Sequence, residues 1–438
     1  MEPPVCVFNV FRNGQAVAEW FMVEHMRVRK LVALVAAWVL VAAVPAAART
    51  DDPLYDQLWG LRRIGAESAW QYSRGEGVVI AVIDTGVDLE HPDLKDQVVP
   101  GMSVVGEGQP DDKHGHGSLI AGIAAAGAGN AEGIAGVAPD ARVLPVRVFD
   151  AAGSATSSSV ARAIRFAVDA ADRRRAKLVL NLSFVGPSQP QTMVDGDPGS
   201  AIFGDEAVKR AVSDAAASGA VVVTAAGNES APHTAFDPPS HEGIIVVGAS
   251  DKEDKCTTFT NYGPGLDILA PGIGILSTYW NASDDKSGYA YADGTSMAVP
   301  FVAGAAALLM AEGLTNVEAV DRLISTARGP GVSCRQEGNR YRILDVAAAF
   351  GVTREEGDVG GPDDDKEPST PIPSALILQG DGEAPVVVDP ETGAQALAPN
   401  DQVSGLLKIT PLRALATSLL FVVLTFMLLA RTYGEPEP

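Results

Sequence analysis

A serine at the start of a predicted helix has surroundings that suggest nucleophilic chemistry. Ser296 lies in the run Gly-Thr-Ser-Met-Ala at 294–298, and an apolar stretch of helical composition follows it at once. At a helix start the backbone N–H groups lack partners within the helix, and the positive end of the helix dipole favours a developing oxyanion. Taken alone, the motif also describes an ordinary helix N-cap, so Ser296 needs partners elsewhere in the chain.

An acid and an imidazole precede this serine in the chain. Asp84 ends the continuous apolar run 78–83, which is typical of a strand buried on both faces of a parallel sheet. It is therefore expected at the carboxyl edge of the sheet, where such folds keep their sites. His116 begins a run of small residues typical of a helix. This combination predicts nucleophilic catalysis, in which His116 takes the proton of Ser296 and Asp84 orients the imidazole.

With these surroundings, the chain resembles the subtilisin-like serine proteases, or subtilases. The resemblance covers about residues 52–350 and includes four motifs: Asp-Thr-Gly at Asp84, Gly-His-Gly at His116, Ala-Ala-Gly-Asn at Asn228 and Gly-Thr-Ser-Met-Ala at Ser296. It implies a serine endopeptidase that acts through an acyl-enzyme, with Asp84, His116 and Ser296 as the catalytic residues. It also assigns the oxyanion hole to the side-chain amide of Asn228 and the backbone N–H of Ser296.

Neighbouring residues of the same types have more ordinary interpretations. Asp88 and His91 follow the glycine turn after Asp84, and we expect them to be solvated loop groups. His114 lacks the helix start that follows His116, so we do not expect it to be the base. Asn228 follows the apolar segment 220–226, where an asparagine can simply make a turn, but the motif match favours the oxyanion role.

Substrate binding in the family relies mostly on the backbone, because an extended peptide adds strands to two edges of the site. By motif, the resemblance implies that the edges and pocket walls here are Gly153, Ser154, Ala155, Ser183, Phe184, Val185, Gly186, Ala225, Ala226 and Gly227. Val185 stands where the family usually has a glycine, so we expect it to narrow the mouth of the specificity pocket. The alternative is that these segments are only the ends of strands.

The rest of the sequence predicts the elements that must position these residues. Alanine-rich helical segments at 160–171, 205–218 and 300–311 alternate with β-branched runs at 78–83, 143–148, 178–182, 220–224 and 244–248. This alternation predicts an α/β fold, with a doubly wound parallel sheet covered by helices, which is the subtilisin type. The catalytic domain is predicted to span residues 49–352.

The N-terminal residues indicate export. A basic head at 26–30, an apolar stretch and Ala-Ala-Ala at 46–48 predict a signal peptide at 26–48. We interpret residues 1–25 as a doubtful preface before the true start. The alternative is an uncleaved anchor at 31–48. We expect no activation by removal of a long pro-domain, because the catalytic domain follows the signal so closely.

The C-terminal residues predict a membrane tether. Residues 353–411 form an acidic linker rich in Pro and Gly; within 354–407, twelve Asp and Glu oppose Arg354 and Lys366, a net charge of −10 out of −22 for the chain. Residues 412–431 predict a single transmembrane helix and 432–438 a cytoplasmic tail, which would anchor an exported catalytic domain in the cytoplasmic membrane. The acidity argues against a nucleic-acid partner.

Cysteine usage and metal binding remain open from sequence. Cys256 and Cys334 are the two cysteines of the exported part; in an oxidising compartment they favour one disulfide over two isolated thiols. The resemblance requires no cofactor, but it allows a structural Ca²⁺ held by Asp93 and Asn130.

Two classes of function compete at this stage. The leading one is a membrane-anchored serine endopeptidase that cleaves exported proteins or peptides. Leu119 and Phe301 stand at positions where many subtilases have histidines. In this respect the chain is similar to the mycosins, which are membrane-anchored subtilases associated with type VII secretion. The resemblance implies secretion-system components as partners. The other is a catalytically idle scaffold that binds peptides or serves as a structural component of a secretion machine. The presence of all three catalytic residues and of Asn228 favours the enzyme.

Overall fold

The computed structural model describes residues 50–150, 153–184, 204–232, 243–281, 286–335 and 339–354. The chain divides into two compact units, Met1–Thr50 and Asp51–Pro438, and almost all described residues belong to the second. The predicted signal peptide, most of the acidic linker, the predicted transmembrane segment, Val185 and Gly186 lie outside the described residues. Within the described ranges, no helix is long and apolar enough to cross a membrane.

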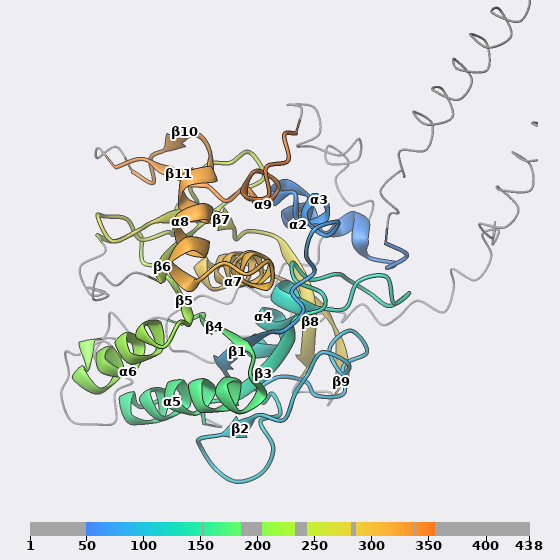
Figure 1. Cartoon of the computed structure of the whole chain (residues 1–438), viewed down its shortest axis with the longest axis vertical. Coiled ribbons are helices and arrows are strands. Elements are labelled where there is room, and N and C mark those ends of the chain that lie inside the picture. The colour runs from blue at the N-terminus through green and yellow to red at the C-terminus, as the bar shows by residue number, and fades with distance from the viewer. Residues whose placement is uncertain are drawn as a thin grey trace, which may run out of the picture. The chain divides into compact units, whose positions relative to one another are not determined.

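A central sheet organises the second unit. Its nine described strands follow the order β10-β11-β7-β6-β5-β4-β1-β3-β2 (Figure 1). Only the β10–β11 pair is antiparallel, so the predicted doubly wound parallel sheet is confirmed. The strands are β1 (Val78–Asp84), β2 (Met102–Ser103), β3 (Arg142–Arg147), β4 (Lys177–Leu182), β5 (Val221–Ala225), β6 (Ile244–Ser250), β7 (Ile268–Pro271), β10 (Arg328–Val332) and β11 (Tyr341–Ile343).

Helices cover both faces of this sheet. On one face pack α4 (His116–Ala125), α7 (Thr295–Ala311) and α8 (Asn316–Thr326); on the other, α5 (Ser157–Arg174) and α6 (Glu206–Ala217) lie side by side (Figure 1). Successive side chains of β1 enter two separate hydrophobic clusters, with Ile80 in the first and Ile83 in the second. Because strand side chains alternate between faces, a strand covered on both sides needs the continuous apolar run seen in the sequence.

Smaller elements complete the domain. These are η1 (Tyr55–Gln57), α2 (Trp59–Ile64), α3 (Ala66–Ala69), α9 (Val346–Ala349) and a hairpin of β8 (Ile275–Asn281) and β9 (Lys286–Ala292). The hairpin packs on α4 and leads into α7. Helix α7 begins at Thr295, so Ser296 lies in its first turn, and the predicted helix start at this serine is confirmed.

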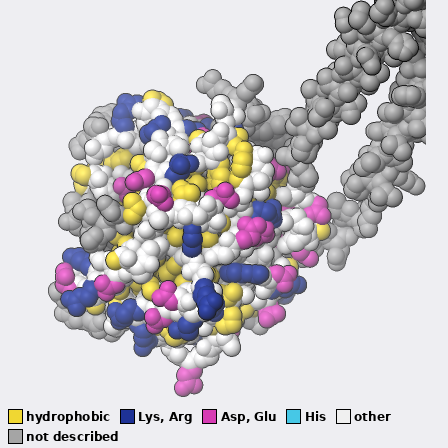
Figure 2. Space-filling view, in the orientation of Figure 1, with side chains coloured by type: hydrophobic (Ala, Val, Ile, Leu, Met, Phe, Trp, Pro, Cys, Tyr) yellow, Lys and Arg dark blue, Asp and Glu magenta, His cyan; other side chains and the backbone are white. Residues whose placement is uncertain are grey.

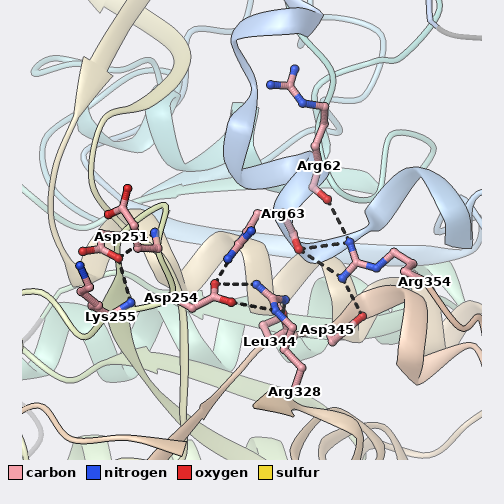
Figure 3. Close-up of polar contacts among 10 residues, drawn as sticks. Arg62, Arg63, Asp251, Asp254, Lys255, Arg328, Leu344, Asp345 and Arg354 are labelled. Carbon is pink, nitrogen blue, oxygen red and sulfur yellow. Dashed lines mark hydrogen bonds and ion pairs between the residues drawn. The ribbon is translucent and has the colours of Figure 1, made fainter. Parts of the chain in front are cut away.

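Charged side chains join the first helices of the domain to its last described residues (Figure 3). Asp254 accepts hydrogen bonds from Arg63 at 3.0 Å and from two nitrogens of Arg328 at 2.7 and 3.1 Å. Burial alone would raise the pKa of Asp254, but hydrogen bonds and charge from Arg328 and Arg63 lower it below its ordinary value. Arg354 pairs with Asp345 at 3.1 Å and donates to carbonyl oxygens at the end of α2. These contacts hold the two ends of the domain together.

A disulfide adds a covalent link in the same region. Cys256, in the loop after β6, is bonded to Cys334, which follows β10, with the Cα atoms 4.9 Å apart. The bridge that the sequence favoured is therefore present.

The expectation that Asp88 and His91 are solvated loop groups is wrong. Both residues are buried. The Nε2 atom of His91 lies 2.8 Å from the carbonyl oxygen of Gly288, and the hydroxyl of Ser287 donates to the Asp88 carboxylate. The β8–β9 hairpin, distant in sequence, covers this loop.

The visible surface is mixed in character. Figure 2 shows Lys and Arg side chains interspersed with Asp and Glu side chains and scattered hydrophobic ones, including the region over α5 and α6. In the described part of the chain, Tyr72 is the one large hydrophobic residue that is well exposed, and it stacks on Phe350 with ring centroids 5.9 Å apart.

Candidate active site

The residues singled out from sequence gather at one edge of the sheet. Strands β5, β4, β1 and β3 are neighbours, and their carboxyl ends meet because the strands are parallel. Asp84 ends β1, Ser183 follows β4, and Asn228 follows β5. Because the carboxyl ends of parallel strands meet at one edge of the sheet, these three residues lie near one another although they are far apart in the sequence.

Asp84 and His116 form a buried pair. Asp84 is fully buried, and its Oδ1 accepts hydrogen bonds from the Thr85 N–H at 2.7 Å and from His116 Nδ1 at 2.8 Å. Its Oδ2 is buried and accepts no hydrogen bond from any described residue. A buried carboxylate that is not fully hydrogen-bonded favours a neighbouring positive charge. With Nδ1 donating to Asp84, Nε2 of His116 is left free to accept a proton.

The pKa of His116 is set by opposing effects. Burial lowers it, but the charge and hydrogen bond of Asp84, together with the charge of Asp112, raise it above the ordinary imidazole value. The imidazolium that forms when His116 takes a proton is therefore stabilised by these carboxylates.

Close backbone approach explains the Gly-His-Gly motif. Gly115, just before α4, has φ 92°, a left-handed conformation that favours glycine. A β-carbon on Gly117 would lie 1.9 Å from the carbonyl oxygen of Gly86 and 3.2 Å from Cβ of Asp84. Helix α4 can therefore lie against the end of β1 only because residue 117 has no side chain, and this brings His116 within hydrogen-bonding distance of Asp84.

Asp112 is a residue of this site that the sequence reading missed. It is buried, and its Oδ1 accepts from the Thr85 hydroxyl at 2.8 Å and from the N–H groups of His114 and Gly115 at 2.9 Å each. Its Oδ2 accepts from the N–H and the hydroxyl of Ser118 at 2.8 and 2.6 Å. Asp112 thus joins the start of α4 to the residue after Asp84. Its position four residues before His116 was the available signal.

Ser296 and Asn228 converge on Gly294. A β-carbon on Gly294 would lie 3.2 Å from Ser296 Oγ and 3.6 Å from Asn228 Nδ2. The same glycine has φ 142°, within the region that favours glycine. Gly294 therefore lies beside both polar atoms, and a side chain at this position would crowd them.

Thr295 fixes the amide of Asn228. The Oδ1 atom of Asn228 accepts hydrogen bonds from the Thr295 N–H at 2.9 Å and from its hydroxyl at 3.0 Å. Because both donors occupy the oxygen, the Nδ2 group is the one that can donate to a ligand. This orientation suits stabilisation of an oxyanion.

Ser183 supports the backbone of Ser296. Its hydroxyl donates to the carbonyl oxygen of Ser296 at 2.9 Å and accepts from Nδ2 of Asn181 at 2.8 Å. Ser183 is buried, so its side chain serves this contact and its backbone is what a peptide could meet.

Between the described atoms of His116 and Ser296 there is no hydrogen bond; in substrate-free enzymes such contacts are often long and tighten on binding.

The two predicted substrate edges follow β3 and β4, the strands on either side of β1. Gly153, Ser154 and Ala155 follow β3, and Ser154 is held in a turn by Asp150, which accepts its N–H at 3.0 Å. Phe149, also after β3, meets Phe184, after β4, edge to face with ring centroids 5.4 Å apart. Ala225, Ala226 and Gly227 continue from β5. His114 is partly exposed nearby, with Nε2 3.0 Å from the carbonyl oxygen of Asp150 and not on Asp84.

The predicted calcium ligands Asp93 and Asn130 are in contact. Asp93 is fully buried; it accepts from Nδ2 of Asn130 at 3.2 Å, the N–H of Ile134 at 2.9 Å and the hydroxyl of Tyr289 at 2.8 Å. Burial raises its pKa in spite of these hydrogen bonds. Asp52, which the sequence reading missed, accepts from the N–H groups of Gly129 and Asn130. No three His, Cys, Asp or Glu side chains of the described residues converge as a metal site.

Fold and site together define a class of protein: a doubly wound α/β domain in which an Asp–His pair and a serine lie at the carboxyl edge of a parallel sheet. The Subtilase family model, Peptidase S8, matches residues 75–356. This chain belongs to the subtilase family. The enzyme class predicted from the motifs, a subtilisin-like serine endopeptidase, is thereby confirmed at the level of the family.

Named relatives show the extent of the similarity. The chain is 41% identical over 285 residues to a thermophilic serine proteinase of Bacillus sp. (strain AK1). The aligned residues cover 64% of this chain and 65% of that proteinase, so the chain spans just under two thirds of the length of this relative. It is 40% identical over 266 residues to thermitase of Thermoactinomyces vulgaris, covering 60% of this chain and 86% of thermitase.

Solved structures agree. A protease from Pseudoalteromonas arctica superposes with a TM-score of 0.60 at 29% identity, over 69% of this chain and 99% of that one. A cold-adapted subtilisin-like serine proteinase gives a TM-score of 0.53 at 30% identity, over 66% and 97%. The similarity therefore lies in the catalytic domain.

The raised pKa of His116 predicts the pH dependence of peptide hydrolysis. The base must be neutral to accept a proton, so kcat/KM should fall as pH drops through this pKa, with the acid limb above about pH 6.5. Asp112→Asn should move the limb to lower pH, because a negative charge that favours the imidazolium is removed. Asp140→Asn, in the loop before β3 at the opposite edge of the sheet, should leave the limb in place. If the acid limb of Asp112→Asn stayed at the wild-type pH, the proposed effect of the Asp112 charge on the pKa of His116 would be wrong.

Proposed function

We propose that this chain hydrolyses peptide bonds through an acyl-enzyme on Ser296. The observation that carries the proposal is the joint placement of the Asp84–His116 hydrogen bond and of the Ser296 and Asn228 polar atoms around Gly294. His116 removes the proton of the Ser296 hydroxyl as the hydroxyl attacks the carbonyl carbon, then returns it to the leaving amine. Asp84 orients the imidazole and stabilises its charged form.

The oxyanion is proposed to be stabilised by the Asn228 amide and by the backbone N–H of Ser296. Ser296 lies in the first turn of α7, where backbone N–H groups have no partner within the helix. Thr295 holds the amide with Nδ2 available. Losing one such donor typically costs about 3 kcal/mol of transition-state stabilisation.

Proteins or peptides are the proposed substrates. An extended chain would pair with the backbone after β3 and after β4, the two segments that Phe149 and Phe184 join. The idle-scaffold alternative is not favoured, because every side chain that the chemistry requires is present.

A structural calcium ion is proposed at the loop that contains Asn130. The residues present include oxygen donors of the kind a hard cation prefers: the buried Asp93 carboxylate, and the amide oxygen of Asn130, which accepts the N–H of Glu132 at 2.9 Å. Backbone carbonyl groups would supply further oxygen ligands. The ion would stabilise the fold and take no part in the reaction.

We further propose that the enzyme is exported and held at the cytoplasmic membrane by residues 412–430, with the catalytic domain outside. Support comes from the sequence: an apolar segment of spanning length follows an acidic linker of more than fifty residues. As a flexible coil, the linker would let the domain move about 40 Å from its anchor. We propose secretion-system components as partners, because Leu119 and Phe301 are similar to the mycosins at these positions.

Replacing the nucleophile tests the catalytic proposal. Ser296→Ala in the full-length chain should abolish both peptide hydrolysis and labelling by a fluorophosphonate, while the thermal unfolding midpoint changes little. Ser154→Ala, at the predicted substrate edge, should still be labelled. Wild-type labelling of the Ser296→Ala protein would place the nucleophile elsewhere, and a wild-type protein that never labels would favour the idle scaffold.

Removing calcium tests the metal proposal without an activity assay. EDTA should lower the thermal unfolding midpoint of the wild-type protein, and added Ca²⁺ should restore it, because the ion binds the folded state alone. Asp93→Asn should lower the midpoint and remove its dependence on Ca²⁺. Asp267→Asn, whose carboxylate accepts the Val246 N–H away from this loop, should keep the dependence. An EDTA-insensitive wild-type midpoint would exclude the site.

Truncation tests the tether. A chain that ends at Gly405 should be released as a soluble, active protease, whereas the full-length chain should stay in the membrane fraction after carbonate washing. The reason is that no catalytic motif lies beyond Ser296. If the truncated protein stayed in the membrane pellet, residues 31–48 would be an uncleaved anchor and the predicted signal peptide would be wrong.

A further inference from the structure

One partly buried asparagine holds the turn that carries Asn228. Asn261 lies in the loop between β6 and β7. Its N–H donates to the carbonyl oxygen of Gly227 at 3.0 Å, and its Nδ2 donates to that of Ala226 at 3.1 Å. Its Oδ1 accepts the N–H groups of Glu229 at 3.1 Å and Ala231 at 2.9 Å. Asn261 therefore contacts the backbone on both sides of Asn228.

The turn needs such support because of its backbone conformation. Gly227 has φ 100° and Ser230 has φ 55°, and a non-glycine residue in the left-handed region is unfavourable unless its surroundings hold it. The packing is close: a β-carbon on Gly227 would lie 2.3 Å from Asn261 Nδ2. The Asn261 side chain fills the space that Gly227 leaves open, so truncation of Asn261 would leave the turn free to shift.

Asn261 is itself well anchored. The Ser230 N–H donates to the Phe259 carbonyl at 2.8 Å, and the Tyr262 N–H donates to that of Ala231 at 3.0 Å, so the two loops are paired over several residues. The hydroxyl of Tyr341, on β11, accepts from the Gly263 N–H at 2.8 Å and donates to its carbonyl oxygen at 2.9 Å. The position of Asn261 is thus fixed by the sheet.

We propose that Asn261 is a positioning residue for the oxyanion donor Asn228. It sets the backbone of the turn, while Thr295 sets the rotation of the amide, and both are needed for Nδ2 to meet the oxyanion. This inference rests on the proposed role of Asn228. A misplacement of about 1 Å in such a site can cost about 100-fold in rate, because the donor acts mainly on the transition state.

Steady-state kinetics on the full-length chain tests the proposal. Asn261→Ala should lower kcat about 10- to 100-fold and leave KM within about 2-fold, the pattern for an interaction made in the transition state. Asn316→Ala is the matched control. Asn316 is a buried asparagine whose Nδ2, like that of Asn261, donates to backbone carbonyl oxygens, those of Ala216 and Ala220 at 2.8 and 3.0 Å, but Ala220 precedes β5 at the edge opposite the site. This control should lose stability with kcat unchanged.

A double variant separates positioning from general damage. If Asn261 acts through Asn228, then Asn261→Ala should cost less than about 3-fold in kcat once Asn228→Ala is present, because effects within one unit are not additive. Multiplicative losses, or an Asn261→Ala kcat within about 2-fold of wild type, would overturn the proposal. An Asn228→Ala variant with wild-type kcat would instead overturn the oxyanion role that the proposed function assigns to it.

Discussion

The hydrogen bond between Asp84 and His116 is the interaction on which the rest of the site depends. A buried carboxylate is costly unless it is paired, and Asp84 is held at the end of a strand that is covered on both faces. Its charge is therefore available where an imidazolium would form. The sheet gives Asp84 a fixed position, and α4 can bring His116 to it only because Gly117 lets the helix lie against the Gly86 carbonyl.

Polar residues one step away from the chemistry hold each functional group in place. Asp112 fixes the start of α4, Ser183 supports the backbone of Ser296, and Thr295 orients the Asn228 amide. The contacts of Ser183 and Thr295 join segments far apart in sequence, and Asp112 is also tied to the residue after Asp84 through the Thr85 hydroxyl. Because the partners are buried and satisfied, the groups keep their geometry before any substrate arrives, which is what stabilisation of a transition-state charge requires.

The same domain is secured at its periphery by charges and a covalent link. Asp254 joins an arginine of α2 to one of β10, and the Cys256–Cys334 disulfide lies in the same region of the chain. The loop between β6 and β7 contains both Cys256 and Asn261, and Asn261 contacts the turn of Asn228. Support for the turn that carries Asn228 therefore comes from the outer strands of the sheet as well as from the site itself.

The sequence by itself determined the parallel α/β fold and predicted the four residues of the candidate site, Asp84, His116, Asn228 and Ser296. It could do so because buried strands and helix starts leave local patterns, and because parallel strands bring their carboxyl ends to one edge. Tertiary structure alone decided the burial of Asp88 and His91, the hydrogen bond from Thr85 to Asp112 and the contacts of Asn261 with the turn of Asn228. These depend on contacts between distant segments, such as the hairpin that covers the loop after β1, and local periodicity carries no information about such contacts.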